Sequence, residues 1–289
     1  METIYENAYA KLNLSLDVSR AREDGYHDMV MVMQTVSLCD ELVIELRTGG
    51  TVRAETGLPY LPQDERNLAV KAAKIYFKQT GREDTGAMIR IKKRSPVGAG
   101  MAGGSTDAAA VLRGLNRYFG NELDREAMLS LAEAVGSDVA FCLLGGTALA
   151  EGRGERLTPL TPLQGCRFVI GKPDFSISTP ELFRALDRAK LHVHPDTAGM
   201  LEAIAAGDVR ALCRRMYNVF EDVPDRRMKS IAEIKRKLFN RGAEGAIMTG
   251  TGSAVFGVFL EEAEAEAACE ELKKGLSFAC CAVPVGQLL

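Results

Sequence analysis

A glycine-rich segment in the first half of the chain has the residue types of a phosphate-binding loop. Residues 96–107 read PVGAGMAGGSTD, with four glycines ahead of an alanine-rich helical pattern. Glycines leave backbone N–H groups uncovered, and a helix start adds unbonded N–H groups and the positive end of the helix dipole. The segment therefore predicts a triphosphate site, with a flexible connector as the alternative. The candidate nucleotide-binding residues are Pro96, Val97, Gly98, Gly100, Gly103, Gly104, Ser105 and Thr106.

Two better-known phosphate loops fit this segment less well. The string Gly98-x-Gly100-x-x-Gly103 satisfies the dinucleotide-binding pattern, but a basic stretch ending in Pro96 separates it from the preceding apolar strand. In the dinucleotide fold the strand turns directly into the first glycine. The chain also contains no G-x-x-x-x-G-K-[ST] string, so the loop is not a Walker loop.

Two charged residues have the chemistry that phosphoryl transfer to an alcohol requires. The reaction needs a group that accepts the hydroxyl proton, and positive charge where the transferring group gathers negative charge. Asp138, at a turn after a helical pattern, could accept the proton, and Lys11, in a strand-like segment, could supply the charge. Residue type alone favours a turn aspartate and a solvated lysine. Only the surrounding motifs favour a catalytic role.

Three motifs resemble the GHMP kinase superfamily and occur in the order found there. The loop at 96–106 resembles its Pro-x-x-x-Gly-x-x-Gly-Ser-Ser/Thr pattern, AKLNL occupies 10–14, and TGTGS occupies 249–253. The resemblance runs from about residue 8 to about residue 260 and implies that ATP donates its γ-phosphoryl group, with Mg²⁺ expected beside it. It assigns catalysis to the positions of Lys11 and Asp138. It also implies substrate contacts from Asn13, Thr249, Gly250, Thr251 and Gly252, although a simple hairpin turn would also explain 249–253.

Further motifs resemble the GHMP kinases that act on a cytidine diphosphate ester in non-mevalonate isoprenoid biosynthesis. They are DGYH at 24–27, GSDV at 136–139 and AEGRGE at 150–155. The resemblance implies that Tyr26 and His27 hold the cytosine and that the 2-hydroxyl of a methylerythritol moiety is phosphorylated. An aromatic ring beside a hydrogen-bonding ring suits a flat pyrimidine. Phe183 is the weaker match to a second aromatic, because TPELFRAL also reads as an ordinary amphipathic helix.

The metal site and the adenine pocket are less well marked. Ser105 could face Mg²⁺ beside the phosphates, but no carboxylate is clearly assigned to a metal. Asn67 could border the adenine, although helix capping explains it adequately. Three other functions stay open: another small-alcohol kinase of the superfamily, a nucleotide-binding regulator without catalysis, and an NAD-dependent dehydrogenase.

The elements expected to position these residues indicate an α+β chain. Strand-like alternation covers 4–18, 41–47 and 88–92, and a helical pattern at 67–79 stops at Gly81. Another helix follows the glycine-rich loop. A third is expected from the capping residue Asp124 to Gly136, which would suit a left-handed C-terminal cap.

The second half is expected to be α/β. Thr179 would cap a helix with Pro180 at its first position, and further helices are expected at 196–206, 208–217, 225–241 and 261–274. A run rich in Pro and Gly at 157–165 places a boundary near 155. The resemblance implies a nucleotide-binding domain over 1–155, similar to domain 2 of ribosomal protein S5, and a substrate-binding domain over 156–289. The active site would lie between them.

Composition bounds the class of protein and its partners. The chain has 289 residues, of which 46% are hydrophobic and 26% charged, and its formal net charge is −3, which argues against a nucleic-acid binder. No signal-peptide pattern or uncharged run of about 20 residues indicates export or membrane insertion. Seven scattered cysteines are typical of a reducing compartment. We therefore expect a cytoplasmic enzyme whose partner is a small molecule.

Overall fold

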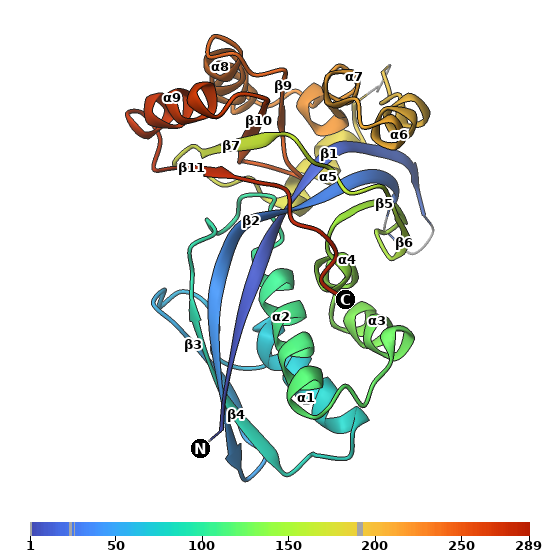
Figure 1. Cartoon of the computed structure of the whole chain (residues 1–289), viewed down its shortest axis with the longest axis vertical. Helices are drawn as coiled ribbons and strands as arrows, with labels where there is room; N and C mark the ends of the chain where they lie inside the picture. Colours follow the sequence, from blue (N-terminus) through green and yellow to red (C-terminus); the bar gives the residue numbers. More distant parts are fainter. Residues whose placement is uncertain (1, 23–24, 26, 190–192) are drawn as a thin grey trace.

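The larger of two sheets is built around one long hairpin that runs almost the full height of the molecule (Figure 1). The structure is a computed structural model that describes residues 2–22, 25, 27–189 and 193–289. The hairpin pairs β1 with β2 in antiparallel register from Thr3 opposite Glu45 to Ala21 opposite His27. The strands of this sheet are β1 (Thr3–Ala21), β2 (His27–Thr48), β3 (Val52–Thr56), β4 (Thr85–Lys92), β5 (Thr147–Gly152), β6 (Arg156–Pro159) and β8 (Tyr217–Asn218).

The strand β2 changes partner along its length. Its C-terminal part pairs with β4, its N-terminal part pairs with β5, and β1 lies along its other edge. Sequence alternation predicted only 41–47 of this strand. The preceding part, residues 31–36, is a continuous buried run of Met, Val, Gln and Thr without alternation, because that part of the strand is covered on both faces.

Four helices lie on one side of the lower part of this sheet, and α3 packs on the other three helices (Figure 1). They are α1 (Leu68–Gln79), α2 (Gly103–Tyr118), α3 (Arg125–Val135) and α4 (Val139–Leu144). The alanines of α2, including Ala108, Ala109 and Ala110, are fully buried. Their small side chains let α2 lie close to both the sheet and its neighbouring helices. The start of α2, where the loop residues lie, is thereby fixed at the middle of the molecule.

The second sheet is antiparallel and has the order β11-β7-β10-β9. Its strands are β7 (Arg167–Lys172), β9 (Gly245–Met248), β10 (Val255–Phe259) and β11 (Phe278–Ala282). The remaining helices are α5 (Thr179–Leu186), α6 (Thr197–Ala206), α7 (Val209–Cys213), the 3₁₀ helix η1 (Val219–Asp222), α8 (Met228–Phe239) and α9 (Glu262–Lys273). The fold is therefore α+β with two sheets, as the sequence indicated.

Four local predictions differ from the structure. Gly136 caps α3 with φ 177°, which is extended backbone, so the predicted left-handed cap is wrong. The helix predicted to reach 217 ends at Cys213, because Tyr217 and Asn218 pair with β1 instead. The cap of α5 is Ser178, one residue earlier than predicted, and α8 starts at Met228. The predicted division into 1–155 and 156–289 stays a prediction.

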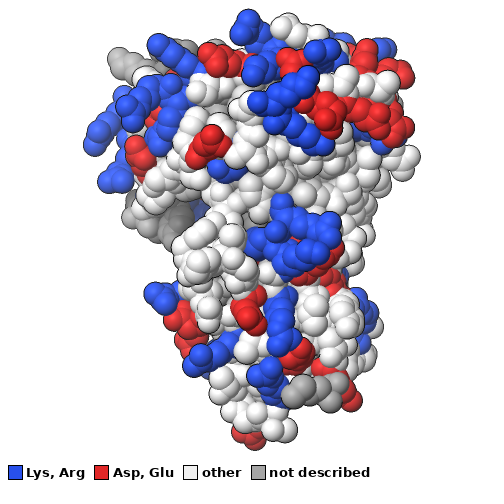
Figure 2. Space-filling model, turned by 90° about the vertical axis from the view of Figure 1, so that its left-hand side faces the viewer, with Lys and Arg blue, Asp and Glu red and all other residues white. Residues whose placement is uncertain are grey.

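Charges of both signs are mixed on the face drawn in Figure 2. Figure 2 shows basic and acidic side chains interspersed over both halves of one face. Among the described residues, no helix combines the length and the apolar character that crossing a bilayer requires.

Candidate active site

A cavity of 1080 Å³ lies between the glycine-rich loop, the turn after β9 and α5. Its wall is formed by the loop at 96–105, the turn at 136–138, the start of β2, α5 and the turn at 250–252. Candidate residues from both halves of the sequence therefore line one cleft. Those that line it are Lys11, His27, Asn67, Pro96, Val97, Gly98, Gly100, Gly103, Gly104, Ser105, Asp138, Phe183, Gly250, Thr251 and Gly252.

The backbone of the loop presents unbonded donors to this cleft. Ala102 precedes α2 with φ 57° and gives no side-chain cap. Within the described part of the chain, no acceptor bonds the N–H groups of Gly103, Gly104 or Ser105. Together with the positive end of the α2 dipole, these donors have the chemistry that the predicted phosphate site requires.

The loop and the TGTGS turn interlock through their backbones. Gly100 has φ 74°, and a Cβ placed there would lie 2.1 Å from the carbonyl oxygen of Thr249. The Thr249 hydroxyl accepts from the Asn13 N–H at 3.0 Å and lies 3.3 Å from the carbonyl oxygen of Gly100. One hydroxyl therefore joins β1, the phosphate loop and the turn after β9, so the three sequence motifs meet at Thr249.

Three predicted residues lie behind the cleft wall. Asn13 and Thr249 are fully buried, and Thr106 is 1% exposed with its hydroxyl donating to the carbonyl oxygen of Gly103 at 2.9 Å. None of the three lines the described cavity. They position the wall. Asn67 does line it, while its side chain also caps α1 by accepting from Ala69 N–H at 3.0 Å.

Lys11 and Asp138 face the same cleft from different elements. Lys11 comes from β1, is 5% exposed, and donates from Nζ to Asn13 Oδ1 at 2.6 Å. Asp138 lies at the start of α4, in the turn predicted for it. Among the described residues no ion pair joins the two, and their predicted joint role in catalysis stays a prediction. Both charges act on the buried Cys142, whose thiol pKa is raised by burial and then by Asp138, while Lys11 lowers it.

Aromatic and imidazole rings form the far end of the cleft. The rings of His27 and Phe183 lie 4.8 Å apart with a 32° tilt, and Phe183 meets the edge of Phe220 at 4.9 Å. The weaker sequence match, Phe183, is thus brought against His27. Tyr26, the other predicted base contact, lies outside the described residues.

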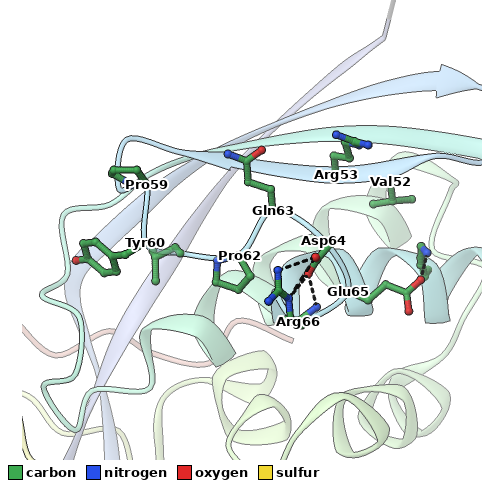
Figure 3. A pocket seen from close by; sticks show the side chains of 11 residues that line it. Val52, Arg53, Pro59, Tyr60, Pro62, Gln63, Asp64, Glu65 and Arg66 are labelled. Atoms are coloured by element: carbon green, nitrogen blue, oxygen red, sulfur yellow. Dashed lines mark hydrogen bonds and ion pairs between the residues drawn. The ribbon is translucent and has the colours of Figure 1, made fainter.

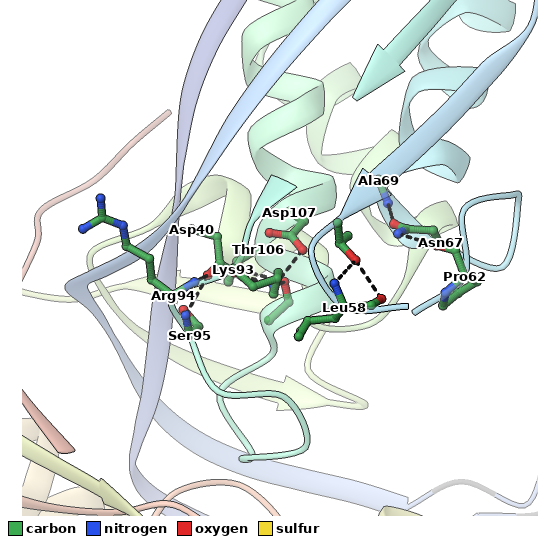
Figure 4. Close-up of polar contacts among 12 residues, drawn as sticks. Asp40, Leu58, Pro62, Asn67, Ala69, Lys93, Arg94, Ser95, Thr106 and Asp107 are labelled. Atoms are coloured by element: carbon green, nitrogen blue, oxygen red, sulfur yellow. Dashed lines mark hydrogen bonds and ion pairs between the residues drawn. The ribbon is translucent and has the colours of Figure 1, made fainter. Parts of the chain in front are cut away.

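A buried charge cluster beneath the loop was missed from the sequence (Figure 4). Lys93 Nζ contacts Asp40 and lies 2.8 Å from Asp107 Oδ2, while Asp40 also accepts from the N–H groups of Arg94 and Ser95. Burial raises the pKa of Asp107 to about 7, since the opposing charge of Lys93 offsets only part of it and Asp40 adds to it. Asp40 and Lys93 are 53 residues apart, so no local pattern links them.

Asp107 and Ser105 are the groups best placed to serve a metal. Asp107 Oδ1 is buried without a hydrogen-bond partner, and both residues line the cleft. The described residues include no cluster of three or more His, Cys, Asp or Glu side chains that could hold an ion by themselves. Mg²⁺ usually takes one or two protein oxygens together with phosphates and waters. The donor set therefore fits an ion that arrives with a nucleotide.

A second cavity of 610 Å³ adjoins the cleft behind the segment 59–66 (Figure 3). It shares Leu61, Pro62 and Arg66 with the cleft, and Asp64 and Arg66 form an ion pair at its rim. Its remaining lining is polar and open, and none of the predicted site residues lies in it.

Comparison with known proteins first defines the class. The model described as "GHMP kinases N terminal domain" matches residues 67–146, and the one described as "GHMP kinases C terminal" matches residues 200–277. A homoserine kinase structure from Cytophaga hutchinsonii has the same fold, with a TM-score of 0.76 over 99% of this chain and 96% of that chain at 19% identity. The fold is that of a GHMP kinase, a class that uses ATP.

Closer relatives then define the family. The 4-diphosphocytidyl-2-C-methyl-D-erythritol kinase of Alkaliphilus metalliredigens is 42% identical over 94% of this chain and 93% of its own length. That of Acetivibrio thermocellus is 41% identical over 94% and 96%. A crystal structure of 4-(cytidine 5'-diphospho)-2C-methyl-D-erythritol kinase is 34% identical, with a TM-score of 0.81, and covers 98% of this chain and all of that chain. The chain belongs to the 4-diphosphocytidyl-2-C-methyl-D-erythritol kinase family.

Proposed function

We propose that this chain transfers the γ-phosphoryl group of ATP to the 2-hydroxyl of 4-diphosphocytidyl-2-C-methyl-D-erythritol, a step of non-mevalonate isoprenoid precursor biosynthesis. One observation carries the proposal beyond family membership. A single cleft contains the unbonded N–H groups at the start of α2, the charged residues Lys11 and Asp138, and the ring pair His27 and Phe183. These are a phosphate site, a reacting site and a base site.

The backbone donors bind and orient the triphosphate. Amide groups at a helix start hold phosphate oxygens in fixed directions, and positioning supplies much of the rate in phosphoryl transfer. Mg²⁺, held by the phosphates with Ser105 or Asp107, would neutralise charge on the transferring group. Val97, 36% exposed at the loop, offers an apolar surface beside the nucleotide.

Asp138 accepts the proton of the acceptor hydroxyl as the oxygen attacks phosphorus. A carboxylate in a closed cleft can take this proton in the transition state. Lys11 stabilises negative charge on the same oxygen, because Asn13 holds its ammonium in one position at 2.6 Å. The two residues thus act on one substrate atom without contacting each other.

A phosphoryl-transfer assay tests this function. We would supply radiolabelled ATP with 4-diphosphocytidyl-2-C-methyl-D-erythritol, free methylerythritol phosphate, mevalonate or homoserine, and measure labelled product. We expect rapid transfer to the cytidine ester alone, because the remote base supplies binding energy that orients the hydroxyl. Equal transfer to the free phosphate, or faster transfer to mevalonate or homoserine, would overturn the substrate while leaving a GHMP kinase.

A further inference from the structure

The last turn of α5 contacts His27 twice. Phe183 and Asp187 are four residues apart, so they lie on the same face of the helix. The Phe183 ring lies beside the imidazole at 4.8 Å, and Asp187 Oδ1 lies 2.7 Å from His27 Nε2. All three residues line the cleft. One helical turn therefore contacts both the face and the edge of the His27 ring.

The same helix is fixed to the rest of the active site. At its start, the Thr179 hydroxyl lies 2.9 Å from the Thr251 hydroxyl, which belongs to the TGTGS turn. Near its end, Phe183 is held by the edge of Phe220. The His27 side chain is only 12% exposed, whereas that of Asp187 is 47% exposed. The imidazole is thus the enclosed partner, and its contact with Asp187 decides how it can hydrogen-bond.

We propose that Asp187 is a positioning residue that holds the proton of His27 on Nε2, so that Nδ1 stays an acceptor and selects an amino-bearing pyrimidine. A carboxylate can accept but cannot donate, so a neutral imidazole bonded to it through Nε2 carries its proton there. The nitrogen left for a ligand is then Nδ1. This inference rests on the proposed function, because it assumes that the pyrimidine lies at His27.

An acceptor at His27 Nδ1 distinguishes cytosine from uracil. Cytosine carries an amino group at ring position 4, which donates to an acceptor, whereas uracil carries a carbonyl oxygen there. A lone pair on Nδ1 that faces position 4 bonds the amino group and opposes the carbonyl. A mismatch of this kind leaves two acceptors facing each other and unpaired in an enclosed site, which supports strong discrimination. Asp187 contributes to this selection without contacting the base.

The first test reads the proton on His27 without any activity measurement. The chain has three histidines, and ¹⁵N NMR of the histidine-labelled full chain distinguishes protonated from bare ring nitrogens. The His27 signals are those missing in His27→Ala. We expect a protonated Nε2 and a bare Nδ1 in the wild type, and a mixture of tautomers in Asp187→Ala. A wild-type ring with the proton on Nδ1, or on both nitrogens, would overturn the proposal.

The second test measures kcat and KM for the cytidine diphosphate ester and its uridine analogue. Asp187→Ala should raise KM for the cytidine ester about tenfold, with kcat and the KM for ATP nearly unchanged. The ratio of kcat/KM for the cytidine ester to that for the uridine analogue should therefore fall about tenfold. Glu181→Ala is the matched control, because Glu181 lies on the same helix outside the cleft lining and contacts Arg227. It should keep the wild-type preference.

Thermal melts of both variants check that α5 stays folded. If the wild type accepts the cytidine ester but Asp187→Ala keeps its full preference, the role of Asp187 is wrong and the proposed function stands. If the wild type does not accept the cytidine ester, both are wrong.

Discussion

The two ends of the cleft differ in the groups that form them: one is formed by backbone groups and the other by side chains. The proposed phosphate end is made of backbone: N–H groups of consecutive residues at the start of α2, beside glycines with positive φ. The acceptor end is made of side chains that come from β1, β2, the start of α4 and α5. The first end therefore depends on backbone geometry and on close backbone contacts, whereas the second depends on particular functional groups.

The largest expected effect tests the acceptor end. Asp138→Asn keeps the shape of the side chain but removes its capacity to accept a proton. We expect kcat to fall about 10²–10⁴-fold, with the affinity for ATP, measured by calorimetry, close to that of the wild type. Turnover near the wild-type rate in a folded variant would remove Asp138 from the mechanism.

Lys11→Met sharpens this test. Because both residues are proposed to act on one oxygen atom, the double variant should lose less activity than the product of the two single losses. Independent, multiplicative losses would argue that Lys11 and Asp138 act at separate steps.

A smaller effect is expected from adding one methyl group at the phosphate end. In Gly100→Ala the new Cβ would meet the Thr249 carbonyl oxygen at 2.1 Å and the Gly252 nitrogen at 2.9 Å, at a φ of 74°. We expect the free energy of unfolding, measured in urea, to fall by about 2–4 kcal/mol, with weaker ATP binding.

Gly104→Ala is the matched control for that variant. Its Cβ would meet only Leu68 Cδ1, at the ordinary distance of 3.7 Å, so the free energy of unfolding should change by less than about 0.5 kcal/mol. Equal effects at Gly100 and Gly104 would show that the backbone contact with Thr249 does not hold the loop.

The last prediction is a pH dependence and concerns Asp107, whose side chain lies under the backbone end. Its pKa is raised from 3.8 to about 7 in the folded chain, mainly by burial. Between these values the folded state keeps a proton that the unfolded state has lost. The contribution of Asp107 to stability is thus complete below about pH 4 and is lost as the pH rises through 7, with a slope of at most about 1.4 kcal/mol per unit.

Asp107→Asn should remove this slope. The difference in free energy of unfolding between variant and wild type, measured in urea from pH 4.5 to 8, should shift in favour of the variant as the pH rises and level off above 7. Parallel profiles for the two proteins would contradict the raised pKa.

The same difference between the backbone end and the side-chain end of the cleft explains how much of each could be predicted from the sequence. The loop at 96–107 was identified because its glycines and the following helix are consecutive, and helix α1 was predicted almost to the residue from its pattern and its cap Asn67. The contact of His27 with Asp187 joins residues 160 apart, and no local pattern encodes it. The cluster of Asp40, Lys93 and Asp107 was missed for the same reason.

A local preference for helix also failed to predict the structure where a residue pairs with a distant strand. The helical pattern at 208–217 ends early because residues 217 and 218 satisfy their backbone groups on β1. Even the two catalytic candidates were favoured only through motif context, since neither Lys11 nor Asp138 stands out by residue type.

The β1–β2 hairpin has a mechanical consequence. Its strands continue from the helix-covered lower part of the sheet up to His27, so the ladder that supports Lys11 also supports the base end. Bending the molecule at its middle would require breaking rungs of this ladder. The frame of the cleft is accordingly stiff, because each broken rung would leave backbone N–H and C=O groups without partners.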